Sequence, residues 1–156
     1  MKKVLFISST GGHLSELLQL KPLFAEYDSY LITEKTKSTV GLREEYGKKV
    51  SFLVYGSRHH LFSYLFKFSW NILKSFWLFL KIRPAVVVTT GTHTAVPMCY
   101  IAKLFRKKVI FIETFANRET CTESGKMVYP IADVFIVQWE SMLEIYPNAV
   151  YGGFIF

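Results

Sequence analysis

The chain begins with a short apolar run that ends in a glycine turn and leads into an amphipathic segment. The run covers residues 4–7, the turn covers residues 8–13, and leucines then recur at helical spacing. Gly11 and Gly12 allow a sharp turn, and the free amides of a helix N-terminus favour an anion. The glycine spacing is neither that of a dinucleotide-binding loop nor that of a P-loop. The stretch therefore predicts a strand, a turn and a helix with a phosphate site, and leaves the kind of phosphate open.

The same alternation continues along the chain. Apolar, often β-branched runs predict further strands at residues 30–33, 50–55, 85–89, 109–112, 134–137 and 149–151. Helical spacing covers residues 13–25, 61–82 and 95–105, and the polar run 34–49 predicts a loop with a short helix at most. We therefore expect an α/β fold with one Rossmann-like domain over residues 1–156. Its open parallel sheet should place a binding crevice at the carboxyl ends of the strands.

Three polar side chains directly follow predicted strands and could converge on one side of the sheet: His13, His93 and Glu113. Because histidine titrates close to neutral pH, His13 suits a general base or a phosphate hydrogen-bond donor, although it could merely cap or pack. Glu113 ends an apolar strand, where a buried carboxylate is costly. It could act as a base, orient a hydroxyl, or simply pair with a cation such as Arg118.

A second glycine turn repeats the opening arrangement before the helix expected at residues 95–105. It contains Gly91, Thr92 and His93, whose donors stand at a helix start, and helix capping explains the threonine equally well. Asn117 and Arg118 could contact an acceptor or a partner, or belong to a solvated loop. We take all five, together with Gly11 and Gly12, as candidate acceptor or phosphate contacts.

The charge distribution narrows the classes of partner. The formal net charge is +7, and eleven Lys or Arg but no Asp or Glu lie between Glu45 and Glu113. Such a basic block suits nucleic acid, anionic lipid headgroups or a phosphorylated substrate. Hydrophobic residues make up 51% of the chain and aromatic residues 17%, more than one core of this size needs. Nucleic-acid binding is disfavoured, because the central lysines lie in a strongly apolar segment rather than on a solvated basic surface.

The segment 61–82 carries the strongest physical signal. Lys67, Lys74 and Lys81 are spaced by seven and form one narrow stripe on a helix, and most other positions are apolar. A spanning helix needs roughly 20 mostly apolar residues. We therefore expect a helix lying in the membrane interface, with His59 and His60 near the headgroups. A crossover helix wedged between the sheet and a partner subunit is the alternative. The expected interface residues are Lys67, Trp70, Lys74, Phe76, Trp77, Phe79 and Lys81.

Other kinds of site find no support in the sequence. There is no Asp-x-Asp motif and no His or Cys cluster with zinc spacing, so no metal is predicted. Cys99 and Cys121 form no disulfide framework and lie beside no base at a fixed spacing. The apolar run after Met1 is too short for a signal-peptide core. We expect both cysteines to be structural or incidental and the chain to remain on the cytosolic side.

Three stretches together resemble a known family: the glycine turn at residues 8–14, the turn at 90–94 and the segment 111–118. They resemble the membrane-recruiting, acceptor-side subunit of two-component GT-B glycosyltransferases. This family includes capsule and exopolysaccharide subunits of the PssD type and the larger subunit of the UDP-GlcNAc transferase of asparagine-linked glycosylation. The chain is also similar to the N-terminal half of MurG-type transferases, and residues 151–154 are similar to the end of the bacterial subunits.

The resemblance implies a GT-B enzyme split in two, in which this chain is the N-terminal, acceptor-side half and a partner binds the UDP-sugar donor. The complex would transfer a sugar to a polyprenyl-diphosphate-linked saccharide at the cytoplasmic face of the cell membrane, where this chain is peripheral, and no cofactor is implied. By position, His13 matches the family histidine near the acceptor diphosphate, and Glu113 matches the polar position after the fifth strand. The alternatives are a non-catalytic membrane adaptor and a complete nucleotide-sugar site within this chain.

Overall fold

The computed structural model describes the backbone of residues 1–56 and 61–156, and the side chains outside residues 57–64. Its centre is a sheet of seven parallel strands in the order β3-β2-β1-β4-β5-β6-β7. The strands are β1 (Lys3–Ile7), β2 (Asp28–Lys35), β3 (Val50–Val54), β4 (Val86–Thr89), β5 (Lys108–Ile112), β6 (Val134–Val137) and β7 (Val150–Tyr151). The predicted Rossmann-like parallel sheet is confirmed.

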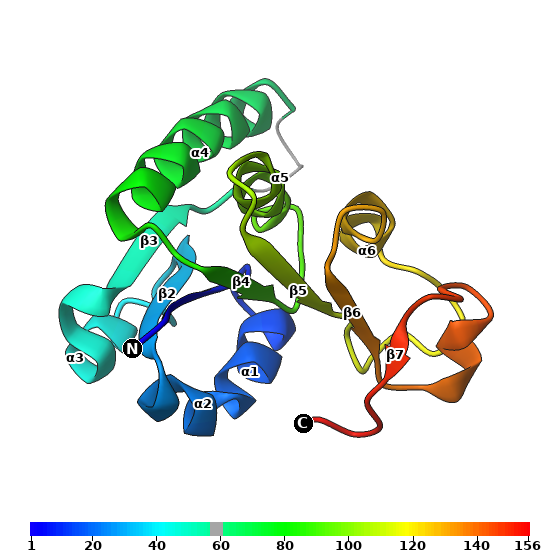
Figure 1. Cartoon of the computed structure of the whole chain (residues 1–156). Coiled ribbons are helices and arrows are strands. Elements are labelled where there is room, and N and C mark those ends of the chain that lie inside the picture. Colours follow the sequence, from blue (N-terminus) through cyan, green and yellow to red (C-terminus); the bar gives the residue numbers. More distant parts are fainter. Residues whose placement is uncertain (57–60) are drawn as a thin grey trace.

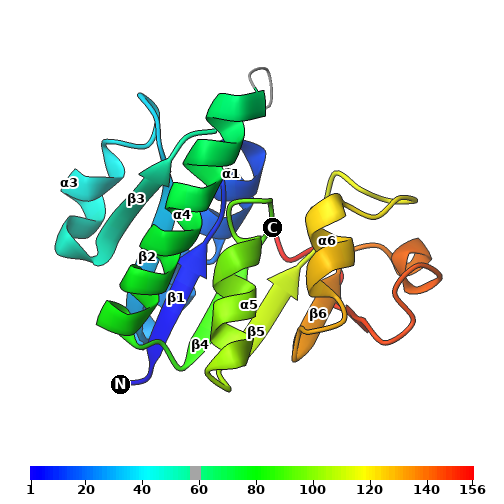
Figure 2. The same ribbon diagram turned by 90° about the horizontal axis from the view of Figure 1, so that it is seen from above.

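Helices cover both faces of this sheet (Figure 1). They are α1 (Gly12–Gln19), α2 (Lys21–Glu26), α3 (Leu42–Tyr46), α4 (Leu61–Ile82), α5 (Val96–Leu104) and α6 (Glu123–Val128), with short 3₁₀ turns η1 (Gly47–Lys49) and η2 (Glu140–Leu143). Figure 2 shows α4, α5 and α6 side by side on one face. Helices α1, α2 and α3 lie on the other face, where the tail after β7 also packs.

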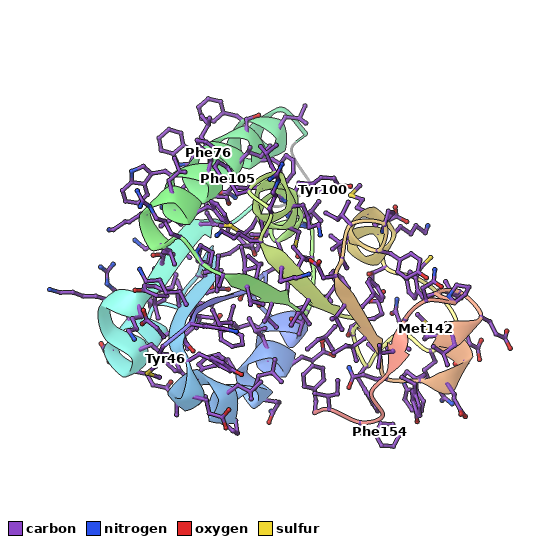
Figure 3. All side chains as sticks on the ribbon, viewed as in Figure 1. Tyr46, Phe76, Tyr100, Phe105, Met142 and Phe154 are labelled. Atoms are coloured by element: carbon purple, nitrogen blue, oxygen red, sulfur yellow. The ribbon has the colours of Figure 1, made fainter. Side chains whose placement is uncertain are left out.

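The strands explain both layers of the core, because successive side chains point to opposite faces. On β1, Leu5 and Ile7 face the layer with α4 and α5, whereas Val4 and Phe6 face the layer with α1. All four are buried, which is why the sequence shows a continuous apolar run rather than an alternating one. Figure 3 shows side chains filling both layers.

The first helix differs from its prediction. The sequence predicts one helix over residues 13–25, whereas the structure has two, α1 and α2, with a break at Leu20. Pro22 is the cause, because proline has no N–H and its ring clashes with the carbonyl four residues earlier. Pro22 instead occupies the first turn of α2, where its fixed φ is favourable.

Two further elements have no counterpart in the prediction. Helix α6 begins after Thr122, whose hydroxyl accepts a 2.9 Å hydrogen bond from the N–H of Gly125. With six residues and an internal glycine it lacks helical periodicity, as does the four-residue turn η2. The run 34–49 does contain only short helical pieces, as predicted, but Glu34 and Lys35 belong to β2.

The strand order positions the site. From β1 the chain proceeds to β2 and β3 on one side, and from β4 it proceeds to β5, β6 and β7 on the other. The loops after β1 and β4 therefore diverge, and a crevice opens between them at the carboxyl ends of the strands. His13 follows β1 and His93 follows β4, so both belong to the loops that flank this crevice.

Candidate functional site

Two hydrogen bonds, each from a side chain to a backbone carbonyl oxygen, join the two glycine turns. His13 Nδ1 lies 2.8 Å from the carbonyl oxygen of Thr90, and the Thr90 hydroxyl donates to the carbonyl oxygen of His13 at 2.7 Å. A carbonyl oxygen can only accept, so Nδ1 carries the proton. In the neutral ring, Nε2 then carries the lone pair and is the nitrogen that can accept a proton from a ligand.

The imidazole of His13 lines a cavity of about 190 Å³ between the two turns and α6. The other lining residues are Thr92, His93, Thr122, Glu123, Ser124 and Met127. The predicted convergence of His13 and His93 is therefore observed. Residues of α6 were not expected here, and they form the wall that faces the two turns.

Glycine is required at two positions of these turns. Gly11 and Gly91 have φ of 87° and 99°, a conformation that side chains disfavour. A Cβ on Gly91 would lie 3.0 Å from the Ser124 hydroxyl. Nothing lies within 4 Å of the corresponding position on Gly12, and no side chain caps the N-terminus of α1. The first turn of α1 thus leaves room for a ligand group beside its backbone amides.

Glu34 is a site residue that the sequence analysis missed. It lies near the carboxyl end of β2, is 2% exposed, and has Oε1 2.6 Å from the donating hydroxyl of Thr94. Its Oε2 accepts a 3.4 Å hydrogen bond from the N–H of Thr10, and Oε1 lies 3.9 Å from His93 Nε2. A carboxylate at the end of an apolar strand was the available signal, the same one that singled out Glu113.

Glu113 is 1% exposed, and its carboxylate is enclosed by hydrogen bonds. It accepts from the hydroxyls of Thr122 and Tyr146 at 3.0 Å and from the N–H of Thr114 at 3.0 Å. Burial, together with the adjacent Glu113 carboxylate, raises the pKa of Tyr146, so its hydroxyl stays protonated and donates. Glu113 therefore fixes the start of α6, and it does not line the cavity.

Glu16 on α1 connects the first turn to the loop after β5. Its Oε1 accepts from the Thr114 hydroxyl at 2.8 Å and from the N–H of Phe115 at 3.0 Å. Its Oε2 lies 3.9 Å from His13 Nδ1. The sequence analysis did not single out Glu16, because a glutamate on an amphipathic helix is usually a solvated one.

Asn117 and Arg118, both predicted acceptor contacts, do not line this cavity. The Asn117 amide donates to the carbonyl oxygen of Thr120 at 3.1 Å. The Arg118 guanidinium lies 4.4 Å from the ring centre of Trp139, a cation–π distance. Trp139 belongs to an aromatic cluster at the carboxyl end of β5 and β6 that also contains Phe115 and Phe154.

Helix α4 turns much of its apolar surface outward. Its buried face carries Asn71, Ser75, Leu78, Phe79 and Ile82. The exposed apolar side chains on α4 and the neighbouring end of α5 form what we call the aromatic surface: Leu65, Phe66, Trp70, Ile72, Leu73, Phe76, Trp77, Leu80, Leu104 and Phe105. Phe76 and Phe105 meet there with ring centres 6.1 Å apart (Figure 3).

The predicted lysine stripe flanks the aromatic surface. Lys74 borders a groove of about 360 Å³ with Trp70, Leu73 and Trp77, and Lys81 Nζ lies 5.0 Å from the Trp77 ring centre. Lys67 borders the next groove along the helix, beside Phe66 and Trp70. All three lysines thus lie beside aromatic side chains of the aromatic surface, and the ammonium group of Lys81 lies at a cation–π distance from Trp77.

The position of Phe79 differs from the prediction. It was expected at the membrane interface, but it is 2% exposed and packs against Phe105 with ring centres 5.1 Å apart. The sequence could not separate it from Phe76, because apolar residues occupy most of the helix circumference and only the sheet determines which face is covered. His59 and His60 lie outside the described residues.

Across residues 1–56 and 61–156, no helix is long and apolar enough to cross a membrane, and no cluster of His, Cys, Asp or Glu could hold a metal ion.

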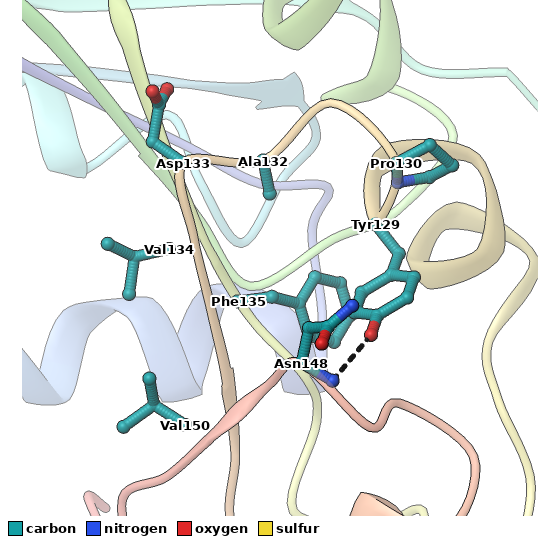
Figure 4. A pocket seen from close by; sticks show the side chains of 8 residues that line it. All are labelled: Tyr129, Pro130, Ala132, Asp133, Val134, Phe135, Asn148 and Val150. Atoms are coloured by element: carbon teal, nitrogen blue, oxygen red, sulfur yellow. Dashed lines mark hydrogen bonds between the residues drawn. The ribbon is translucent and has the colours of Figure 1, made fainter.

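Another cavity, of about 320 Å³, lies by the amino-terminal end of β6 (Figure 4). Two of its polar side chains, Tyr129 and Asp133, already have protein partners. The Tyr129 hydroxyl accepts from the N–H of Asn148 at 2.8 Å, and Asp133 pairs with Lys103 and Lys108. The cavity at His13 is therefore the better candidate.

Comparison with known proteins shows the family of this chain. Residues 4–155 match the family described as oligosaccharide biosynthesis protein Alg14 like. The chain belongs to the Alg14-like family. It is 33% identical to the UDP-N-acetylglucosamine transferase subunit ALG14 of Mus musculus, over 97% of this chain and 82% of the relative. The corresponding subunit of Schizosaccharomyces pombe is 29% identical, over 99% of this chain and 83% of the relative.

Solved structures share the fold of this Alg14-like chain. Acinetobacter baumannii MurG aligns with a TM-score of 0.74 and 17% identity, over 90% of this chain and 43% of that protein. The UDP-GlcNAc 2-epimerase of Methanocaldococcus jannaschii aligns with a TM-score of 0.70 and 16% identity, over 95% of this chain and 42% of that protein. The chain thus spans less than half the length of these structures, and the likeness concerns the fold alone.

Proposed function

We propose that this chain is the acceptor-side subunit of a two-component glycosyltransferase in polysaccharide biosynthesis. A partner subunit supplies the site for a UDP-sugar, and the sugar passes to a polyprenyl-diphosphate-linked saccharide at the cytoplasmic face of the cell membrane. Family membership supports the reaction class, because the relatives are named UDP-N-acetylglucosamine transferase subunits. The description of these relatives as subunits supports the need for a partner.

The observation that carries the proposal is the orientation of His13. Its Nδ1 is held by the carbonyl oxygen of Thr90, and its ring lines the cavity at the crevice between β1 and β4. A base in this position removes the proton from the attacking sugar hydroxyl. The oxygen then forms a bond to the anomeric carbon of the donor sugar, whose bond to UDP breaks, and UDP leaves with the electron pair.

Glu113 has a different part in this proposal. Its oxygens accept hydrogen bonds from Thr122, Tyr146 and the backbone of Thr114, so a substrate hydroxyl has no path to them without displacing these donors. We assign it a positioning role, in which it holds α6 against the cavity. The geometry favours His13 over Glu113 as the base.

The diphosphate of the acceptor is proposed to lie against the two glycine turns. His13 in the first turn of α1 and Thr92 and His93 of the second glycine turn line the cavity, and Gly11, Gly12 and Gly91 stand next to them in the chain. Uncapped amides at the N-terminus of α1 stabilise negative charge. The acceptor site proposed here does not include Asn117 and Arg118, whose side chains contact Thr120 and Trp139 and do not line the cavity.

The aromatic surface is proposed to hold the subunit on the membrane. Trp70 and Trp77 are 53% and 56% exposed, and Phe66 is 77% exposed. A monomeric protein rarely leaves such a continuous apolar patch in water. The lysines beside it suit lipid phosphates, so an interfacial orientation of α4 satisfies both kinds of side chain.

Reconstitution tests the function. The chain is co-expressed with a candidate donor-binding partner, and sugar transfer is measured on a polyprenyl-diphosphate saccharide in membranes. We expect activity only when both proteins are present. Full activity of the partner alone would refute a required subunit. Tight UDP binding by this chain alone would instead indicate a nucleotide-sugar site within it.

The second candidate is a non-catalytic adaptor that recruits and activates its partner at the membrane. The aromatic surface favours it, because that surface serves an adaptor equally well. His13→Asn separates the two readings. An adaptor keeps full transfer activity with this substitution, whereas a subunit that supplies the base loses turnover and still binds membrane and partner.

A further inference from the structure

The two histidines that line the cavity have different neighbours. His13 donates to a backbone carbonyl, whereas His93 Nε2 lies 3.9 Å from the Oε1 atom of Glu34. Both side chains are partly exposed to the cavity, at 25% and 31%. The fold thus places two imidazoles on one cavity, and each lies 3.9 Å from a carboxylate oxygen, His13 Nδ1 from Glu16 Oε2 and His93 Nε2 from Glu34 Oε1. Of the two carboxyl side chains, that of Glu34 is the more deeply buried, at 3% exposed against 16% for Glu16.

Hydrogen bonds from two other residues hold the Glu34 carboxylate in place. Thr94 and Thr10 donate to its two oxygens, so the carboxylate is fixed between the loops after β1 and β4. Among the described residues, no Lys or Arg forms a salt bridge with Glu34, and the ion pair that the structure shows for it is with His93. A buried negative charge without a counter-charge is unfavourable, and a positive charge on His93 offsets it.

We propose that Glu34 is a positioning residue that keeps His93 protonated and oriented toward the cavity, where its positive charge binds the diphosphate of the acceptor. The two histidines then have different roles. His13 accepts a proton from the attacking hydroxyl, and His93 carries a positive charge that binds the diphosphate. This inference rests on the proposed function for the identity of the ligand. The pairing of Glu34 with His93 can be tested without any transfer reaction.

The first test is a titration of the histidines by NMR in the full chain, labelled at histidine and held in detergent micelles. Within the part of the chain that the structure describes, the groups near His93 include Glu34 on β2, His13 and Glu123 on the cavity wall, and the Phe68 ring on α4. In Glu34→Gln the amide oxygen can still accept from Thr94, but the negative charge is gone. We expect the titration midpoint of His93 to fall by about one pH unit, with His13 little changed. An unchanged His93 midpoint would overturn the proposal.

The second test measures binding of inorganic diphosphate to the same proteins. At pH 7.5 we expect Glu34→Gln to bind several-fold more weakly than the wild type, because His93 has lost its charge. At pH 5.5, below the ordinary pKa of histidine, we expect His93 to bind a proton with or without Glu34, so the difference should become small. The diphosphate also changes its own protonation between the two pH values. This change is the same for both proteins, so it does not affect the comparison of their affinities at one pH. Equal binding at both pH values, despite a shifted His93, would overturn the anion-binding role.

Two control variants distinguish the loss of the Glu34 charge from a general change in the structure. Glu34→Asp keeps the charge and should recover most of the His93 midpoint and of the diphosphate affinity. Glu45→Gln removes a carboxylate that pairs with Lys21 away from the cavity and should change neither. If Glu34 only braced the loops, Glu34→Gln would leave the His93 midpoint unchanged. Failure of sugar transfer in the reconstituted complex would count against the proposed function and would leave the titration result standing.

Discussion

His13 and Thr90, which lie 77 residues apart in the sequence, exchange two hydrogen bonds, from the imidazole Nδ1 to the Thr90 carbonyl oxygen and from the Thr90 hydroxyl back to the His13 carbonyl oxygen. These two hydrogen bonds orient the proposed base through backbone oxygens, and the carboxylate of Glu16 lies 3.9 Å from the same Nδ1. This arrangement joins the two turns that flank the crevice, so the site and the fold are positioned by the same contacts.

Replacing His13 should separate proton transfer from binding. In His13→Asn the amide can still donate to the Thr90 carbonyl oxygen, but no nitrogen remains to accept a proton. We expect kcat to fall by roughly 10²–10⁴-fold with little change in KM for the acceptor. Steady-state transfer with the reconstituted partner measures both. His13→Ala also loses the bond to Thr90 and should raise KM in addition. Wild-type turnover in His13→Asn would exclude His13 as the base.

Gly125→Ala should weaken the wall of the cavity. An added Cβ would contact the Glu113 Oε2 atom, lie 2.5 Å from the Tyr146 hydroxyl and lie 2.8 Å from the Thr122 hydroxyl. These atoms are fixed by mutual hydrogen bonds, so we expect a loss of about 1–3 kcal/mol in the free energy of unfolding. Denaturant unfolding measures it. Gly41→Ala is the control, because nothing lies within 4 Å of its Cβ, and it should change stability by less than about 0.5 kcal/mol. Equal effects of the two substitutions would contradict this account.

The aromatic surface should determine membrane binding. We expect Trp70→Gln combined with Trp77→Gln to reduce binding to liposomes at least tenfold, because both indoles are exposed on α4. Sedimentation with vesicles measures this. Val150→Gln removes an exposed apolar side chain on β7 and should leave binding intact. Loss of the partner without loss of vesicle binding would instead make this surface a protein interface.

The lysine stripe should add an electrostatic part to that binding. Substitution of Lys67, Lys74 and Lys81 by Gln should weaken binding to anionic vesicles by about 1 kcal/mol per lysine and hardly affect neutral ones. The same charge change at the exposed Lys21, Lys48 and Lys49, which lie on α2 and η1, is the matched control. High salt should remove the difference, since exposed charges are screened. Equal losses in the two triple variants would show that net charge alone matters.

Asp133 should give the stability of the chain an acid-dependent part. Burial alone would raise its pKa, but the N–H of Val109 and the ammonium groups of Lys108 and Lys103 outweigh burial and lower the pKa to about 2. Because the folded pKa lies below the unfolded value, the stabilisation is present above about pH 4 and is lost as the pH falls toward 2. We expect Asp133→Asn to cost on the order of 1 kcal/mol at pH 7 and almost nothing near pH 2. Unfolding curves at the two pH values measure this, and a loss that persists near pH 2 would contradict it.

Much of the fold could be predicted from local patterns. Apolar runs separated by helical spacing predict a parallel sheet, and β1, α4, α5 and β6 were predicted with nearly the bounds that the structure shows. The break at Leu20 follows from Pro22, a signal that was present but was outweighed by the leucine periodicity. Helix α6 could not be found in this way, because six residues with a glycine have no periodicity.

The site was predicted in part. His13 and His93 each stand directly after an apolar run, so their meeting at one cavity follows from parallel strand order. Glu34 was assigned to a loop, because only the pairing of β2 with β1 and β3 shows that the strand reaches Lys35. For Glu113, the sequence left a base and a structural carboxylate equally open, and the hydrogen bonds from Thr122 and Tyr146 favour the latter.

The glycine turn and the segment 61–82 show what the sequence alone determines. Turn chemistry and periodicity are local, so the sequence was sufficient for a strand, turn and helix at Gly11 and Gly12 and for a helix with a lysine stripe. Only the tertiary structure decided that Phe79 is buried while Trp77 is exposed, and that His13 meets Thr90 while His93 meets Glu34. Burial and pairing depend on which distant segments the sheet brings together, and no local pattern along the chain carries that information.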